Sequence, residues 1–292
     1  MEIRQCFLVK NECYTKNQRQ RSLPASQQDS RYRRYYQGPT HIVVHSTGVN
    51  NPWLLRYVQP DDGVLGVNRN GNSWNNPGIE ACVNAFIGKV DDGRIAVYQT
   101  LPWEYRPWGV GGGSKGSYND CAIQFEICED GHKDESYARE CYEQAAQFCA
   151  YLCDKYSIPV SGIVSHHEAH QAGYGSDHTD PDNWWPKFGL TMDGLRKRVH
   201  EILDASKEQP EEEQEMSEEN LKAVLSAVLS TAMDGTGTGD NPSAWAKEAA
   251  EWAKENGIIN GFGGNDMGWQ KLLTREQMAT VLYRFAKLMG KA

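Results

Sequence analysis

The segment SGIVSHHEAHQAGYGSDHTDP, residues 161–181, decides which fold and which kind of site this chain can build. It begins with a short apolar stretch that predicts a strand over Ser161–His166. Four of the chain's eight histidines then fall between His166 and His178. Imidazole and carboxylate groups at such short spacing suit a borderline-soft cation such as zinc. A polar loop with solvent-facing histidines is the alternative, but the density of the cluster beside Asp180 favours a metal or catalytic site.

Outward from this segment, strands and helices alternate over residues 1–204. Alternating or β-branched apolar stretches predict strands at 40–45, 82–88, 95–99 and 121–128, with the middle two forming a hairpin around an Asp-Asp-Gly turn. Apolar residues at helical spacing predict helices at 134–156 and 191–204. The pattern indicates an α/β domain, a mixed β-sheet flanked by helices.

Two of the predicted strands end in a histidine. THIVVH ends at His45 and SGIVSH ends at His166, so neighbouring strands could present both imidazoles at one edge of the sheet. Asp180 from the following loop supplies a third donor, and three ligands with an open position are typical of catalytic zinc. Glu126 lies on the predicted strand 121–128, where it is either a general base or acid or a carboxylate in a salt bridge.

Composition excludes several classes of protein. The chain has 292 residues with 30 Lys and Arg against 39 Asp and Glu, which argues against a nucleic-acid partner. No apolar run is long enough for a transmembrane segment. The first twenty residues show no signal-peptide pattern, so we expect synthesis and retention in the cytoplasm unless another process releases the protein. The eight cysteines form no CxxC pair and are expected to be reduced and largely buried.

Composition changes after residue 204. SKEQPEEEQEMSEEN, residues 205–219, is acidic and predicts a linker; apolar spacing predicts a short helix at 217–233, and the Gly/Thr-rich segment 234–240 predicts a hinge. Residues 241–292 then predict a small all-α domain. It would have a helix over 245–257, a short apolar turn over 258–263, and a second helix opened by the capping box Thr274–Gln277, with Met278, Val281, Leu282 and Phe285 inside.

Four motifs in order carry a resemblance over residues 1–200. HIVVHSTG at 41–48, FIGKVDDG at 86–93, IQFEICED at 123–130, and IVSHHEAH at 163–170 with HTDP at 178–181 are similar to type-2 N-acetylmuramoyl-L-alanine amidases. That family is related to peptidoglycan recognition proteins and phage lysozyme-type amidases. The likeness is closest to endolysins of phages that infect clostridia-like Gram-positive hosts. The resemblance implies a mixed sheet with one zinc ion, and hydrolysis of the amide between N-acetylmuramic acid and L-alanine.

The same resemblance assigns roles to individual residues. The metal ligands fall on His45, His166 and Asp180, although Asp177 and Asp182 remain alternatives for the third because the segment is longer than usual. Glu126 falls on the catalytic position, where it would accept the proton of a zinc-activated water and return it to the leaving nitrogen. His178 stands where the family often has lysine, and would donate a hydrogen bond to the oxyanion. His167 and His170 are then bystanders, and Glu168 could hold a ligand histidine.

Candidate substrate-binding residues lie where this chain departs from the family pattern and in segments rich in aromatic residues. Asn84 stands where the family frequently has a histidine, and Gly109 follows Trp108 where many members have Trp-His, so substrate positioning is expected to differ there. The segment 101–117 and Trp184-Trp185 are expected to flank the cleft, because tryptophan faces cover sugar surfaces. We therefore predict Asn84, Trp108 and Trp184 as substrate-binding residues, with core packing as the alternative for Trp185.

The C-terminal segment carries a second resemblance. WAKEAAEWAKENGIINGFGG at 245–264 and LTREQMATVLYRFAK at 273–287 are similar to an S-layer homology module. Such modules usually attach proteins to secondary cell-wall polymers in three copies, so this single copy could bind such a polymer or form a homo-oligomer that restores avidity. A small dimerisation or spacer domain is the alternative.

Together these patterns predict a peptidoglycan hydrolase of the endolysin type that uses Zn²⁺. It would be made in the host cytoplasm and act on the wall of a Gram-positive host after release. A cytoplasmic amidase that recycles muropeptides is one alternative, disfavoured by the wall-type second module. A zinc-free peptidoglycan-binding protein is another, disfavoured by the retained ligand set.

Overall fold

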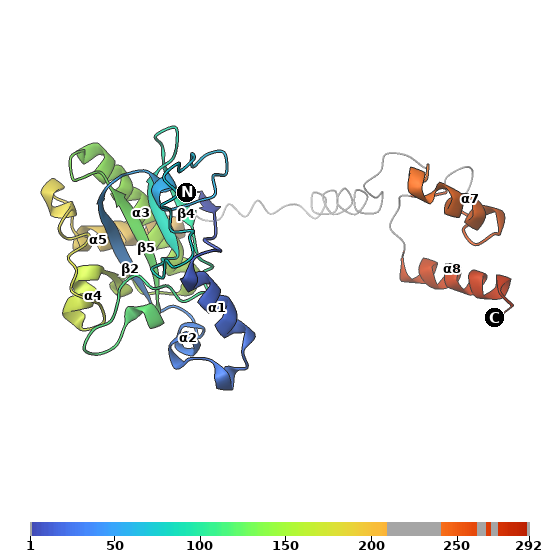
Figure 1. Cartoon of the computed structure of the whole chain (residues 1–292), viewed down its shortest axis with the longest axis horizontal. Coiled ribbons are helices and arrows are strands. Elements are labelled where there is room, and N and C mark those ends of the chain that lie inside the picture. The colour runs from blue at the N-terminus through green and yellow to red at the C-terminus, as the bar shows by residue number, and fades with distance from the viewer. Residues whose placement is uncertain (1, 209–240, 262–266, 270–273, 291–292) are drawn as a thin grey trace. The chain divides into compact units, whose positions relative to one another are not determined.

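The structure is a computed structural model that describes residues 2–208, 241–261, 267–269 and 274–290. The chain divides into two compact units, residues 1–209 and 210–292 (Figure 1). Among the described residues, no helix is both long and apolar enough to cross a membrane.

The first unit is built on a six-stranded mixed sheet in the order β1-β4-β3-β5-β2-β6. Its strands are β1 (Ile3–Gln5), β2 (His41–Asn50), β3 (Ala85–Lys89), β4 (Ile95–Gln99), β5 (Ala122–Glu129) and β6 (Ile163–Ser165). Only β3 and β4 pair antiparallel, as the predicted hairpin requires, and the other neighbours are parallel. The predicted mixed sheet is therefore confirmed, although β2 continues five residues beyond His45.

Two long helices cover one face of this sheet. They are α3 (Glu135–Tyr156) and α5 (Met192–Glu208), and α5 extends four residues past its predicted end. The alternation on β5, within the strand predicted at 121–128, turns Ile123, Phe125 and Ile127 into the core beneath these helices. Cys141, Cys149 and Cys153 of α3 join the same core as small apolar side chains, and all eight cysteines are free thiols.

The remaining elements of the first unit were not predicted. Helices α1 (Glu12–Ser22) and α2 (Ser30–Tyr35) are rich in charged and polar residues and carry no helical apolar spacing; Asn11 and Asp29 cap them. Helix α4 (His166–Ala172) begins directly at the end of β6. The short 3₁₀ segments are η1 (Ala25–Gln27), η2 (Leu54–Arg56), η3 (Tyr118–Asp120), η4 (Val160–Gly162) and η5 (Trp185–Phe188).

The second unit contains η6 (Ala244–Ala246), α7 (Lys247–Glu255) and α8 (Arg275–Leu288). The capping box of Thr274 and Gln277 at the start of α8 is confirmed. Of the apolar side chains expected inside, Met278, Leu282 and Phe285 are exposed and Val281 is partly exposed among the described residues. The helix predicted at 217–233, the hinge at 234–240 and part of the turn at 258–263 lie outside the described residues.

Candidate metal centre and active site

Two neighbouring parallel strands bring the predicted histidine ligands together. Val44 of β2 pairs with Ser165 of β6, so the next residues, His45 and His166, lie side by side. Ser165 ends its strand by capping α4, where its side chain accepts a hydrogen bond from the backbone N–H of Glu168. His45 continues a strand while His166 opens a helix, and this difference lets the two rings meet at 83° with centroids 4.7 Å apart.

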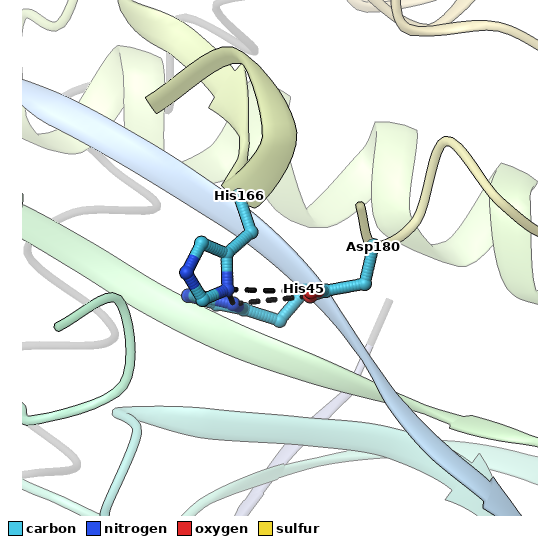
Figure 2. Close-up of side chains that lie close together, drawn as sticks. All are labelled: His45, His166 and Asp180. Carbon is cyan, nitrogen blue, oxygen red and sulfur yellow. Dashed lines mark hydrogen bonds and ion pairs between the residues drawn. The ribbon is translucent and has the colours of Figure 1, made fainter. Parts of the chain in front are cut away.

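Three donor atoms converge at this point (Figure 2). The two imidazole Nδ1 atoms lie 3.1 Å apart, and each lies 3.3 Å from a carboxylate oxygen of Asp180. Zinc bonds of about 2.0–2.1 Å at tetrahedral angles place neighbouring ligand atoms about 3.3 Å apart. The spacing of His45, His166 and Asp180 therefore fits three corners of a zinc tetrahedron.

The tautomer of His45 is fixed by a chain of amides. His45 Nε2 lies 3.0 Å from Gln124 Oε1, and Gln124 Nε2 donates to Asn119 Oδ1 at 2.8 Å. Asn119 Oδ1 also accepts from the backbone N–H groups of Gly109 and Val110, which leaves no choice in its orientation. Gln124 must therefore present oxygen to the ring, so Nε2 carries the proton and the Nδ1 lone pair faces the metal centre.

His166 is fixed in the same way by a different partner. Its Nε2 lies 3.1 Å from Ser176 Oγ, whose own proton goes to the Val110 carbonyl at 3.1 Å. The hydroxyl must accept from His166, so this Nδ1 lone pair also faces inward. Two lone pairs and a carboxylate within 3.3 Å of one another require a positive charge between them, either a proton or a metal ion.

The structure also settles which acidic residue can act as third ligand. Among the described residues, Asp180 is the one carboxylate grouped with the two histidines, whereas Asp177 and Asp182 stay outside the group. The backbone N–H of Ser46 donates to Asp180 Oδ2 at 3.2 Å. Burial alone would raise the pKa of Asp180, but its contacts with His166 and His45 outweigh burial and hold that pKa well below its usual range.

Glu126 lies on the strand next to His45. The two residues are direct partners in the pairing of β5 with β2. Glu126 borders a cavity of about 440 Å³ that His45, His166 and Asp180 also line, and its Oε2 is buried without a hydrogen bond in the described part of the chain. Burial, then the charges of Asp180 and Glu129, raise the pKa of Glu126 well above its ordinary value. An unpaired carboxyl group aimed at this cavity is suited to exchange protons with a ligand there.

His178 borders the same cavity from the loop before Asp180. Its ring stacks on that of His166 with centroids 4.5 Å apart and an angle of 2° between planes. The side chain is 61% exposed, so it can reach a ligand in the cavity. His167 and His170 are absent from the lining, since their rings turn to Gln171 and Asp177 respectively.

Comparison with known proteins identifies the family. The model of the N-acetylmuramoyl-L-alanine amidase family matches residues 34–183, just over half of the chain. The chain belongs to the N-acetylmuramoyl-L-alanine amidase family. A model of the S-layer homology domain matches residues 240–279, in line with the second resemblance. A search of the curated proteins found no match.

Several solved structures are similar to this amidase. The hydrolase AmiA of Staphylococcus aureus, solved with its ligand, is 20% identical, with 72% of this chain and 87% of that chain covered and a TM-score of 0.46. The catalytic domain of XlyA is 20% identical, with 68% and 99% covered and a TM-score of 0.41. PlyL is 19% identical, with 68% and 97% covered and a TM-score of 0.43.

Two residues predicted to bind substrate are interior residues of the amidase. Asn84 is fully buried, where its side chain donates to the carbonyls of Pro102 and Tyr105 and accepts from the Gln124 N–H. Trp184 is also fully buried and belongs to the core beneath α3. Both predictions are wrong, because neither side chain reaches solvent. Trp185 is buried as well, which is the core-packing alternative.

The predictions for Trp108 and Glu168 have different outcomes. Trp108 is 39% exposed, so its predicted contact with substrate stays open to test. Glu168 does not hold a ligand histidine: its carboxylate accepts from the Ser165 N–H and from Arg196. The residues that do hold the imidazoles, Gln124 and Ser176, were missed in the sequence. The only signal for Gln124 was its place two residues before Glu126, on the same face of β5.

Proposed function

We propose that this chain is a zinc-dependent N-acetylmuramoyl-L-alanine amidase that hydrolyses peptidoglycan at the amide joining N-acetylmuramic acid to L-alanine. One observation carries the proposal. The inward lone pairs of His45 and His166 and the Asp180 carboxylate form a cation site, and the unpaired Oε2 of Glu126 borders the same cavity. The family match supports the choice of bond, and the donor set with its spacing supports zinc.

The chain's own residues divide the chemistry between them. Zinc, when bound, supplies a water of lowered pKa and a Lewis acid for the amide oxygen. Glu126 accepts a proton from the attacking water and returns it to the nitrogen of L-alanine as the C–N bond breaks. The exposed ring of His178 donates a hydrogen bond to the oxygen that gains negative charge. Gln124 and Ser176 keep the ligand imidazoles in the correct tautomer throughout.

We further propose that the protein acts as an endolysin of phage origin on a Gram-positive wall. The S-layer homology match at residues 240–279 supports attachment to a secondary cell-wall polymer, directly or through a homo-oligomer. The protein would be made in the host cytoplasm and reach the wall after release. Co-sedimentation of the full chain with purified walls, before and after extraction of secondary polymers, tests this; equal retention in both would contradict polymer binding.

Mass spectrometry of digested peptidoglycan tests the bond that is cut. Released stem peptides with a free N-terminal L-alanine are expected, and their absence would contradict the proposal. Purified protein should contain about one zinc per chain, because the described residues form one such ligand set, and a chelator should abolish activity. Faster cleavage of soluble muropeptides than of intact walls would favour a recycling enzyme instead.

The variant Glu126→Gln separates proton transfer from metal binding. It should keep zinc and lose activity by about 10²-fold or more, because general acid–base catalysis contributes about 10²–10⁴. Glu140→Gln, an exposed glutamate on α3, is the matched control and should behave as the parent. Near-normal activity of Glu126→Gln would place the base elsewhere.

A further inference from the structure

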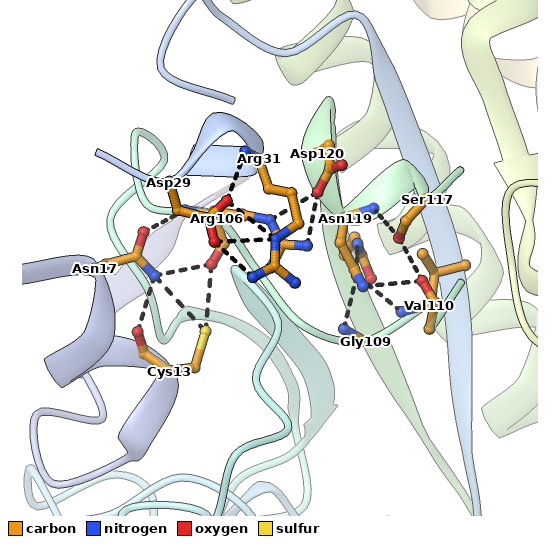
Figure 3. Close-up of polar contacts among 12 residues, drawn as sticks. Cys13, Asn17, Asp29, Arg31, Arg106, Gly109, Val110, Ser117, Asn119 and Asp120 are labelled. Carbon is orange, nitrogen blue, oxygen red and sulfur yellow. Dashed lines mark hydrogen bonds and ion pairs between the residues drawn. The ribbon is translucent and has the colours of Figure 1, made fainter. Parts of the chain in front are cut away.

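A second cavity, of about 510 Å³, lies beside the metal centre. We call it the basic pocket. The lining residues used below are Lys16, Arg19, Asp29, Arg31, Arg106, Trp108 and Asn119. Its lining residues belong to α1, to α2 with its N-cap Asp29, and to the segment 106–119. Figure 3 shows Asp29, Arg31 and Arg106 on one side of this region and Asn119 with Gly109 on the other. Helix α1 and most of α2 precede the residues that the family model matches.

The charge of this pocket is opposite to that of the chain. Four cationic side chains and one carboxylate line it, whereas the whole chain has a net charge of −9. Residues 11–36, which form α1 and α2, contain six Lys or Arg and two Asp or Glu. Cations that line a concave surface create a positive potential that attracts anions.

Acidic partners that lie outside the pocket hold two of these cations in place. Arg106 is buried and donates through Nε and Nη2 to Asp120 Oδ1 at 2.8 and 2.7 Å. Lys16 lies 2.6 Å from Glu80, and neither Glu80 nor Asp120 lines the pocket. Because these carboxylates stand behind the cations, the guanidinium and ammonium groups are oriented before any ligand arrives.

The other two cations differ in how they are held. Arg31 pairs with Asp29, the one carboxylate that borders the pocket, at 2.6 Å. Arg19 is exposed and makes no ion pair within the described part of the chain. Arg19 is thus available to pair with an incoming anion, and the planar fork of Arg31 can bind a carboxylate through two parallel hydrogen bonds.

The basic pocket and the metal cavity share one wall. Trp108 lines the basic pocket and the next residue, Gly109, lines the metal cavity. Asn119 also lines the basic pocket, and it holds Gln124, the partner of the ligand His45. A peptide extends at most about 3.3–3.6 Å per residue. A substrate whose amide lies in the metal cavity can therefore place its next residue or two along this wall.

The geometry points to the basic pocket as the subsite for the peptide side of the substrate, an inference that rests on the proposed function. We propose that it binds the free α-carboxylate of the second stem residue, a γ-linked D-glutamate, and so selects stems in which this group is not amidated. The glycan side of the cut amide is uncharged, whereas an unamidated stem carries carboxylates, so the cationic pocket matches the peptide side. The exposed face of Trp108, with Lys16 Nζ 5.3 Å from its ring centre, would cover the peptide backbone.

Binding of two matched probes tests this selectivity. The probes are N-acetylmuramoyl-L-alanyl-D-glutamate and N-acetylmuramoyl-L-alanyl-D-isoglutamine, which differ by one carboxylate. Calorimetry is done on the full chain carrying Glu126→Gln, so that no turnover occurs. We expect the acid to bind about fivefold more tightly than the amide, and the ratio to fall as salt is added.

Charge-removing variants assign the effect to the pocket. In the same background, Arg19→Gln and Arg31→Gln should each bring the ratio towards one while leaving the affinity for the amide unchanged. Arg33→Gln is the matched control, because Arg33 lies on the same helix as Arg31 and does not line the pocket. Arg19→Gln removes no ion pair of the described residues, so its effect is not a folding defect.

The outcomes separate this inference from the proposed function. Equal binding of the two probes by the parent, or an unchanged ratio in both charge variants, overturns the pocket assignment even if mass spectrometry finds the expected bond cut. A charge-dependent ratio with no free L-alanine in digests would support the carboxylate site and overturn the amidase proposal.

Discussion

Gln124 fixes the tautomer of a metal ligand, so its removal should weaken zinc binding without any change in the ligands. In Gln124→Met the side chain keeps its approximate volume and loses the oxygen that accepts from His45 Nε2 at 3.0 Å. His45 and Gln124 are both buried, so water cannot readily replace that oxygen. The ring would then be free to change tautomer and turn a protonated Nδ1 towards the metal centre.

The size of the effect follows from the lost hydrogen bond. A buried donor left without its partner costs about 1–3 kcal/mol, and about 1.4 kcal/mol corresponds to a factor of ten. Partners that orient metal ligands change metal affinity by about 10–100-fold. We therefore expect the zinc dissociation constant of Gln124→Met to rise by about 10–100-fold, as measured by competition with a chromophoric chelator near neutral pH.

Gln99→Met is the matched control for this measurement. Gln99 is a buried glutamine of the same sheet, on β4, and its amide bonds to Gln5 and to the Leu101 carbonyl, away from the metal centre. It should lose stability to a similar extent and keep the zinc affinity of the parent. Equal zinc affinity in Gln124→Met and the parent, or an equal loss in both variants, would refute the tautomer argument.

Three further predictions concern the catalytic loop, a surface ion pair and the core. In His178→Lys the ammonium group can still donate the hydrogen bond to the oxyanion, so this variant should keep more activity than His178→Ala; equal activity of the two variants would exclude the oxyanion role. Arg198 donates to Glu143 and lowers its pKa, so the ion pair stabilises the fold above the ordinary carboxyl range and the benefit disappears as the pH falls through the lowered pKa. The melting temperature of Glu143→Gln should thus fall below that of the parent near neutral pH, by at most the equivalent of about 1 kcal/mol for so exposed a pair, and the two should converge in acid. Trp184→Ala should cost about 3–5 kcal/mol in urea unfolding, a loss that a surface tryptophan would not show.

The sheet and the ligand set could be predicted because each depends on local patterns. β4 was bounded correctly by its alternation, and the matching ends of THIVVH and SGIVSH anticipated the pairing that brings His45 beside His166. Three ligands of a tetrahedral ion are few and chemically distinctive, so a short sequence segment can reveal them.

The rest could not be predicted because it depends on what each side chain meets in three dimensions. Trp184 in sequence is equally suited to a sugar site and to a core, and only the packing under α3 decides. Asn84 was placed at the substrate by its position in a motif, yet its amide ties two loop carbonyls to β5. The residues of α1 and α2 carry no helical apolar spacing, so neither these helices nor the basic pocket they line was visible in the sequence.

Residue 109 is glycine where many family members have histidine, and this difference and the role of Gln124 have one physical explanation. A Cβ atom added to Gly109 would lie 2.5 Å from Gln124 Oε1 and 2.9 Å from a methyl group of Val83, closer than real contacts allow. Any larger residue at 109 would therefore displace the oxygen that holds His45. The backbone N–H of Gly109 also donates to Asn119, which orients the Gln124 amide. Glycine at 109 and glutamine at 124 are thus interdependent, because the glycine leaves room for the glutamine side chain. Together they set the tautomer of His45, although neither residue is itself a metal ligand.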